Sequence, residues 1–137
     1  MSIKSGEIKF KYHYSAKIPL ELPDLNSYNK ASRSINGAIL ANRIKQETDR
    51  KISLFLTRPI FPLLTPVKAT FCWTVKDKRK DPDNVAFATK FIFDAIVKKG
   101  ILSDDNLNKI AEIHHYFVVD KDNVGVEISL DTMESAK

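Results

Sequence analysis

Residues 84–99 carry apolar side chains on almost every face of a predicted helix, and this feature most limits how the chain can fold. At about 3.6 residues per turn, most directions around the axis are covered by Val85, Ala86, Phe87, Ala88, Phe91, Ile92, Phe93, Ala95, Ile96 and Val97. Such a helix is buried on more than one side. One sheet covers only one side, so we expect a second subunit to cover another.

Alternating apolar and polar residues predict two strands before this helix. Residues 7–18 and 67–76 alternate with a period of two, and further strands are expected near 110–119 and 124–131. Residues Asp120–Asn123 join the last two strands and have the composition of a good hairpin turn.

A second helix is predicted over roughly residues 35–56, and the polar segment 22–29 is predicted to be irregular. The helix 84–99 ends at Lys98-Lys99-Gly100, a favourable C-terminal signal, and residues 131–137 are expected to fray. The order is therefore β-α-β-α-β-β. This predicts a single α+β domain, with two helices packed on a mixed sheet of about four strands.

Composition narrows the class of protein. A chain of 137 residues is long enough for one domain with a core, and its net charge of +5 permits nucleic-acid binding. The one cysteine, Cys72, excludes an intrachain disulfide and a Cys-based zinc site. No apolar run approaches the ~20 residues that span a membrane, and the start lacks an apolar signal core. We expect a cytoplasmic protein.

Two acidic clusters bracket the helix 84–99. Asp81-Pro82-Asp83-Asn84 precedes it, Asp104-Asp105 follows it, and a basic run leads into the first cluster: Lys76, Lys78, Arg79 and Lys80. Carboxylates without Cys or His nearby suit Mg²⁺, which prefers oxygen ligands. A basic surface around an acidic metal site is what a nuclease needs, because it attracts phosphates.

Each feature alone has an ordinary structural explanation. Asp, Asn and Pro are common in turns and helix caps, and lysine runs are usually solvated. On the helix, however, Asp83, Lys90 and Asp94 fall within roughly 40° of one another. A Lys90–Asp94 ion pair would be worth a few tenths of a kcal/mol if exposed, whereas a charged stripe on a buried helix indicates a functional cleft.

These residues resemble the RusA-like Holliday junction resolvases of bacteria and prophages. The family pattern is a basic run, Asp-x-Asp-Asn opening a helix, a Lys within it, Asp-Ala near its end, then Gly and Asp-Asp. Here it reads Lys78-Arg79-Lys80-Asp81-Pro82-Asp83-Asn84, Lys90, Asp94-Ala95, Gly100 and Asp104-Asp105. The segment Pro23-Asp24-Leu25-Asn26-Ser27-Tyr28 is similar to the family's early Pro-x-x-Asn-x-x-Tyr element.

The resemblance implies a homodimeric, Mg²⁺-dependent endonuclease of DNA recombination and repair that resolves four-way junctions by paired nicks, without a nucleotide cofactor. It implies that Asp81, Asp83 and Asp105 are metal ligands and that Lys90 is the catalytic lysine, with Asp104, Asn84 and Asp94 accessory. The cationic run 76–80 would hold DNA backbone. In the family the lysine follows the second Asp by four residues, whereas here it follows Asp83 by seven.

Two other functions fit the sequence: a basic dimeric DNA-binding protein without junction cleavage, and a non-nuclease metal-binding protein with no preference for branched DNA.

Two arrangements of the site also fit. A helix over 84–99 is about 24 Å long, and residues 100–104 recover at most roughly 17 Å. A single chain can complete the site only if it doubles straight back or the helix ends early. Otherwise Asp105 of one subunit meets Asp81 and Asp83 of the other across a two-fold axis. We expect a dimer in either case.

Overall fold

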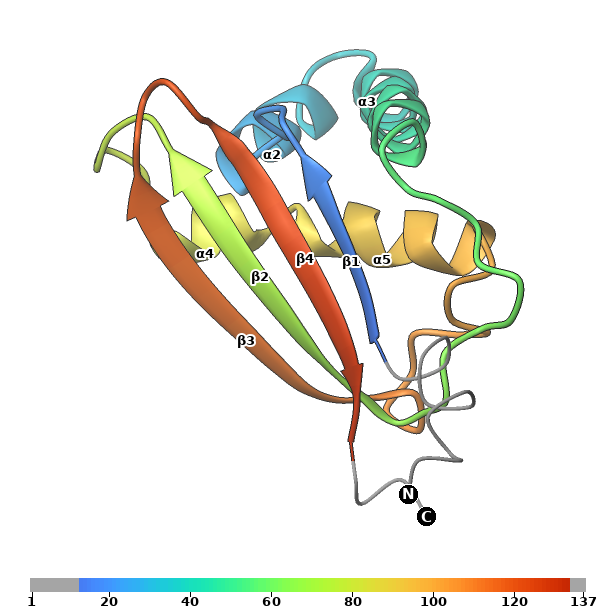
Figure 1. Cartoon of the computed structure of the whole chain (residues 1–137). Coiled ribbons are helices and arrows are strands. Elements are labelled where there is room, and N and C mark those ends of the chain that lie inside the picture. The colour runs from blue at the N-terminus through green and yellow to red at the C-terminus, as the bar shows by residue number, and fades with distance from the viewer. Residues whose placement is uncertain (1–12, 134–137) are drawn as a thin grey trace, which may run out of the picture.

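A mixed sheet with the strand order β1-β4-β2-β3 organises the computed structural model, which describes residues 13–133 of the chain (Figure 1). The elements follow in the order β1 (His13–Ile18), α2 (Leu25–Ser32), α3 (Gly37–Ser53), β2 (Val67–Val75), α4 (Pro82–Ala86), α5 (Thr89–Lys98), β3 (Ile110–Val119) and β4 (Gly125–Thr132). The helices lie together on one face of the sheet (Figure 1).

The predicted α+β domain, its β-α-β-α-β-β order and its mixed sheet are confirmed. The strands β2, β3 and β4 lie at or within a residue of their predicted positions, and α3 lies within the predicted helix 35–56. The first strand begins at His13 among the described residues, and its predicted part from 7 to 12 lies outside them. Of the predicted tail, Asp131 and Thr132 still belong to β4, and residues 134–137 lie outside the described part.

Two helical predictions are wrong in detail. The segment 22–29 is not irregular, because Asp24 caps a helix that begins at Leu25. The predicted helix 84–99 is two helices, α4 and α5, separated at Phe87 and Ala88. Its C-terminal signal is confirmed: Gly100 has a left-handed φ of 79°, and the N–H of Ile101 donates to the C=O of Ile96 at 3.1 Å.

The predicted hairpin between the last two strands is also wrong. Asp120 does form a turn, since its carboxylate accepts hydrogen bonds from the backbone N–H of Asp122 and the side chain of Asn123. However, β3 pairs in parallel with β2, whereas β4 pairs antiparallel with β2 and β1. The chain therefore crosses over β2 after the turn, and β3 becomes an edge of the four-stranded sheet.

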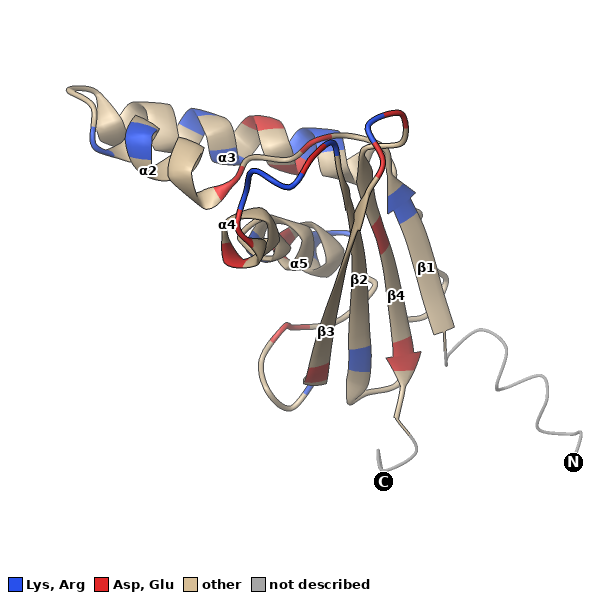
Figure 2. Ribbon diagram, turned by 90° about the vertical axis from the view of Figure 1, so that its left-hand side faces the viewer, with Lys and Arg blue, Asp and Glu red and all other residues tan. Residues whose placement is uncertain are grey.

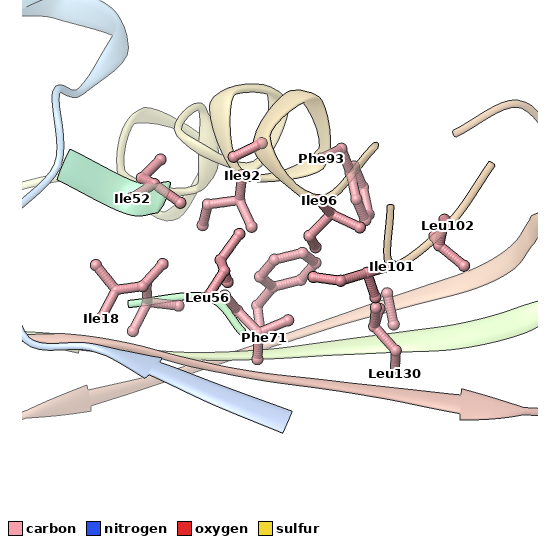
Figure 3. Packing of buried hydrophobic residues seen from close by; sticks show 14 of the residues in the cluster. Ile18, Ile52, Leu56, Phe71, Ile92, Phe93, Ile96, Ile101, Leu102 and Leu130 are labelled. Atoms are coloured by element: carbon pink, nitrogen blue, oxygen red, sulfur yellow. The ribbon is translucent and has the colours of Figure 1, made fainter. Parts of the chain in front are cut away.

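The core lies between the sheet and α5. Alternate residues of β2 and β4 are buried toward the helices, among them Phe71 and Leu130, and they meet Ile92, Phe93 and Ile96 of α5 (Figure 3). On its other side α5 packs against α3. The apolar helix is thus covered within one chain, which corrects the expectation that a second subunit covers it.

Within residues 13–133, no helix is both long and apolar enough to cross a membrane.

Candidate nucleic-acid and metal site

Asp81 and Asp83 lie at the exposed start of α4. Asp81 is the residue before the helix, and its backbone C=O accepts hydrogen bonds from the N–H groups of Asn84 and Val85 at 3.1 and 3.2 Å. Its carboxylate makes no capping hydrogen bond. Pro82 at the first helical position fixes the turn, since its backbone needs no hydrogen-bond acceptor there. The two carboxylates are therefore held on one helical turn and face solvent.

Asn84 ties this turn to the rest of the molecule. Its side chain is buried, and its Oδ1 accepts the backbone N–H of Asn26 at 2.9 Å. Two residues further along, the Tyr28 ring lies 5.4 Å from that of Phe87 and 6.0 Å from that of Phe91. The early Pro23–Tyr28 segment and the acidic motif, which are far apart in the sequence, therefore form one packed unit.

A buried ion pair fixes the end of the basic run. The carboxylate of Asp24 is almost fully buried, caps α2 at the N–H of Ser27 and lies 2.7 Å from the Lys80 ammonium. Lys80 also lies 3.1 Å from Glu21. Burial alone would raise the pKa of Asp24, but hydrogen bonds from Lys80 and Ser27 outweigh it and the pKa lies below its usual value. The hydrogen bond to Asp24 likewise raises the pKa of Lys80.

The other cations of the run have different surroundings. Lys76, Lys78 and Arg79 are exposed, and Arg79 only approaches Asp77 at 3.7 Å. Figure 2 shows this basic segment leading directly to the acidic start of α4. Lys80, which the sequence groups with the DNA-binding cations, is engaged instead by Asp24 and Glu21.

The second acidic cluster lies beyond the other end of α5. Asp104 and Asp105 line an open hollow of about 440 Å³ together with Asp94, Val97, Lys45 and Lys98. The Asp104 carboxylate accepts hydrogen bonds from the backbone N–H of Asp105 at 2.7 Å and from the Asn106 side chain at 3.1 Å. The Asp105 carboxylate is left exposed. Asp94, an accessory residue in the sequence prediction, is thus brought to Asp104 and Asp105.

The proposed metal ligands of one chain do not form a complete site. Within residues 13–133, no group of three or more Asp, Glu, His or Cys side chains is close enough to hold a metal ion. The set of Asp81, Asp83 and Asp105 therefore does not fit Mg²⁺ in a single chain. Lys90 is exposed on α5, and the break at Phe87 and Ala88 places it on a different helix from Asp83.

No family model matches the chain, and no curated protein matches its sequence.

Sequence reasoning missed two structural features of this region. It did not predict that Asp24 pairs with Lys80 or that Asn26 anchors Asn84. Both residues stand in the Pro23–Tyr28 element, so the early motif was the available signal. What it lacked was the information that this element packs against α4.

Proposed function

We propose that this protein is a Mg²⁺-dependent endonuclease that acts as a homodimer and resolves four-way DNA junctions by paired nicks. Asp81, Asp83 and Asp105 are the proposed metal-binding acids, and Lys76, Lys78 and Arg79 hold the DNA backbone. Lys90 is the proposed catalytic cation. The substrate class is branched DNA in recombination and repair.

The observation that carries this proposal is the exposed acid pair on one helical turn, next to an exposed basic segment. Asp81 and Asp83 lie on one helical turn, which the hydrogen bond between Asn84 and the backbone of Asn26 ties to α2. Lys76, Lys78 and Arg79 lie immediately before that turn and are exposed. Cations of this kind attract phosphates without reading sequence, so they would bring a DNA backbone to two carboxylates whose position is fixed.

The separation of the acids supports the need for two chains. A metal site for phosphodiester hydrolysis uses several oxygen ligands together, and residues 13–133 of one chain do not gather three such side chains. A homodimer with a two-fold axis supplies two copies of every acid and two equivalent sites, which suits a pair of symmetric nicks.

The test is cleavage of a synthetic four-way junction in Mg²⁺ by the wild type and the Asp83→Asn variant. We expect Asp83→Asn to abolish cleavage and to leave junction binding unchanged or slightly tighter, because it removes a negative charge near phosphate. Asp122→Asn, in the turn after β3, removes the same charge from another exposed aspartate and should cleave normally. Wild-type cleavage by Asp83→Asn would refute the assignment of the acid site.

A second candidate function is junction binding without cleavage. It is favoured by the separation of Asp105 from Asp81 and Asp83 in one chain and by the later position of Lys90. This candidate predicts tight binding to junctions with no Mg²⁺-dependent nicks by the wild type.

A further inference from the structure

The edge strand β3 exposes an unusual amount of apolar surface. Its side chains at Ile113, Phe117, Val118 and Val119 are 40–47% exposed, and Tyr116 is 57% exposed. By contrast, the neighbouring strand β2 buries alternate residues completely or nearly so. Isolated exposed apolar residues are ordinary on a protein surface, but a contiguous row of them marks an interaction surface.

Part of this row lies on the helix side of the sheet without being covered by a helix. Ile113, Phe117 and Val119 are paired in register with Ala69, Trp73 and Val75 of β2, and paired residues point to the same face. Ala69 and Trp73 are buried beneath the helices, yet their partners on β3 are about half exposed. The apolar surface of the core therefore continues onto the edge strand, beyond the part of the sheet that the helices cover.

The exposed edge also lacks the usual protection against pairing. Residues 113–119 contain no Lys, Arg, Asp, Glu or Pro, although natural edge strands commonly carry such residues to prevent association. The N–H of Asp120 donates to the C=O of Val75 at 2.8 Å. Because the direction of backbone groups alternates along a strand, the N–H and C=O groups of Ile113, His115, Phe117 and Val119 point away from β2.

We propose that β3 is the surface on which a second copy of this chain docks, by antiparallel pairing of the two β3 strands about a two-fold axis at His115. The proposal rests on the proposed function for its need of a dimer, and on the edge strand for the surface and the register. The two four-stranded sheets then become one continuous sheet.

This register is self-complementary on the helix side. It sets Ile113 opposite the partner's Phe117, so that an aliphatic and an aromatic side chain meet twice across the axis. At the axis His115 faces its own copy. Its Nδ1 accepts the Trp73 indole N–H at 2.9 Å, and burial, followed by the effect of His114, lowers the pKa of His115. Both effects favour the uncharged ring at the axis.

Shifted registers are less favourable. An axis at Tyr116 would set Glu112 opposite the partner's Asp120, and like charges directly opposite each other destabilise a strand pair. An axis at His114 would set Ile113 opposite the partner's His115, and the apolar pair would be lost.

The direction of pairing also concerns the acids. In an antiparallel pair, the start of the partner's β3 lies beside the end of this chain's β3, which is itself paired with the end of β2. The partner's acidic segment 104–105 comes just before the start of its β3. The basic run and Asp81 follow the end of β2, and both acidic segments lie on the helix side of the sheet (Figure 2). The pairing therefore moves the two separated acidic clusters toward each other between chains.

Disulfide cross-linking tests the register. His114 is opposite the partner's Tyr116 in a pair without direct hydrogen bonds, where Cα atoms lie about 4.5 Å apart, a separation that a disulfide spans. A chain with His114→Cys and Tyr116→Cys should form covalent dimers on oxidation. The background needs Cys72→Ser, because Cys72 is the neighbour of Tyr116 on β2.

The matched control combines His114→Cys with Val118→Cys on the same face of the strand. In the proposed register these positions face the partner's Tyr116 and Glu112, so this chain should not cross-link. If the control cross-links as well, the axis at His115 is overturned, because an axis at Tyr116 joins position 114 to the partner's position 118 and an axis at His114 joins it to the partner's position 114.

Oligomeric state tests the surface itself. The wild type should sediment at twice its 15.6 kDa chain mass, and Phe117→Lys should dissociate at least tenfold more readily. Ile35→Lys is the control, since Ile35 is fully exposed between α2 and α3, far along the chain from β3, and it should remain dimeric. Circular dichroism shows whether Phe117→Lys is folded, and the cross-linking test is independent of that variant.

The outcomes separate this inference from the proposed function. If the cysteine variant cross-links but the wild type fails to cut junctions, the interface stands and the nuclease proposal is refuted. The interface alone would be refuted if the wild-type dimer cuts junctions, the variant with cysteines at 114 and 116 does not cross-link, and Phe117→Lys remains dimeric.

Discussion

At the scale of single residues, Asp24 connects local structure with the candidate site. It caps α2 through Ser27 and neutralises Lys80 at the end of the basic run. A buried carboxylate without a partner would destabilise the fold. The ion pair avoids this cost and also holds Lys80 in place. The run therefore has one cation held in an ion pair and three exposed cations, which the proposed function assigns to the DNA backbone.

Replacing Asp24 with Asn should destabilise the fold by roughly 1–2 kcal/mol while keeping the helix cap. The expected loss of stability is smaller than for a fully buried ion pair, because the Lys80 side chain is 34% exposed. Glu21→Gln, which removes the more exposed partner of Lys80, should cost a few tenths of a kcal/mol. Urea unfolding at pH 7 measures both, and equal losses would contradict the primary role of Asp24.

The same pair predicts a dependence of stability on pH. The folded pKa of Asp24 lies below its usual value, so its stabilisation is complete above the unfolded pKa near about 3.9. It is lost as pH falls through the folded pKa. The difference in the free energy of unfolding between the wild type and Asp24→Asn should therefore persist from pH 7 to pH 5 and shrink below about pH 4. A constant difference down to pH 3 would contradict this linkage.

At the scale of elements, the sequence predicted what local periodicity determines. Residues 13–18 and 67–75 alternate with a period of two, and the structure forms strands there. The helix α2 was missed because it has no buried residue, so no apolar stripe marks it. The break between α4 and α5 was missed because neither Pro nor Gly stands at Phe87 and Ala88.

Local sequence patterns did not predict which strands pair with each other. The turn at 120–123 has the composition of a hairpin and forms a turn, but nothing in it indicates that β2 lies between β3 and β4. The candidate site shows the same limit. The motif identified exposed acids and cations, whereas the hydrogen bond between Asn26 and Asn84 and the separation of Asp105 from Asp83 depend on tertiary packing.

The basic segment before α4 makes a prediction at this scale. Replacing Lys78 and Arg79 with Ser should weaken binding to all DNA and lower the log–log salt slope by roughly 0.9 for each phosphate that these cations neutralise in the wild type. The control replaces Lys17 and Lys68 with Ser. Both are exposed on the face of the sheet opposite the helices, and their replacement should change the slope less. Fluorescence anisotropy across a salt series measures it, and equal slopes for both variants would place the DNA elsewhere.

At the scale of the whole molecule, one chain separates the acids that the proposed function requires at one site. The fold is complete within one chain, because α5 is covered by the sheet and by α3. The candidate site is not complete, since no described group of side chains in one chain holds a metal. The unprotected edge of β3 offers a way to join two complete folds into one functional unit without exposing either core.

Mixing two inactive variants tests whether the site is shared between chains. Asp83→Asn and Asp105→Asn subunits should each fail to cut junctions alone. If Asp105 of one chain serves Asp81 and Asp83 of the other, a heterodimer contains one site with both substitutions and one with neither, so it should nick one strand of the junction. Sites built within single chains would leave both centres of the heterodimer inactive. A mixture of two Asp83→Asn preparations is the control, and the strand-specific products are resolved on a denaturing gel. Absence of nicking by a verified heterodimer would overturn the shared site.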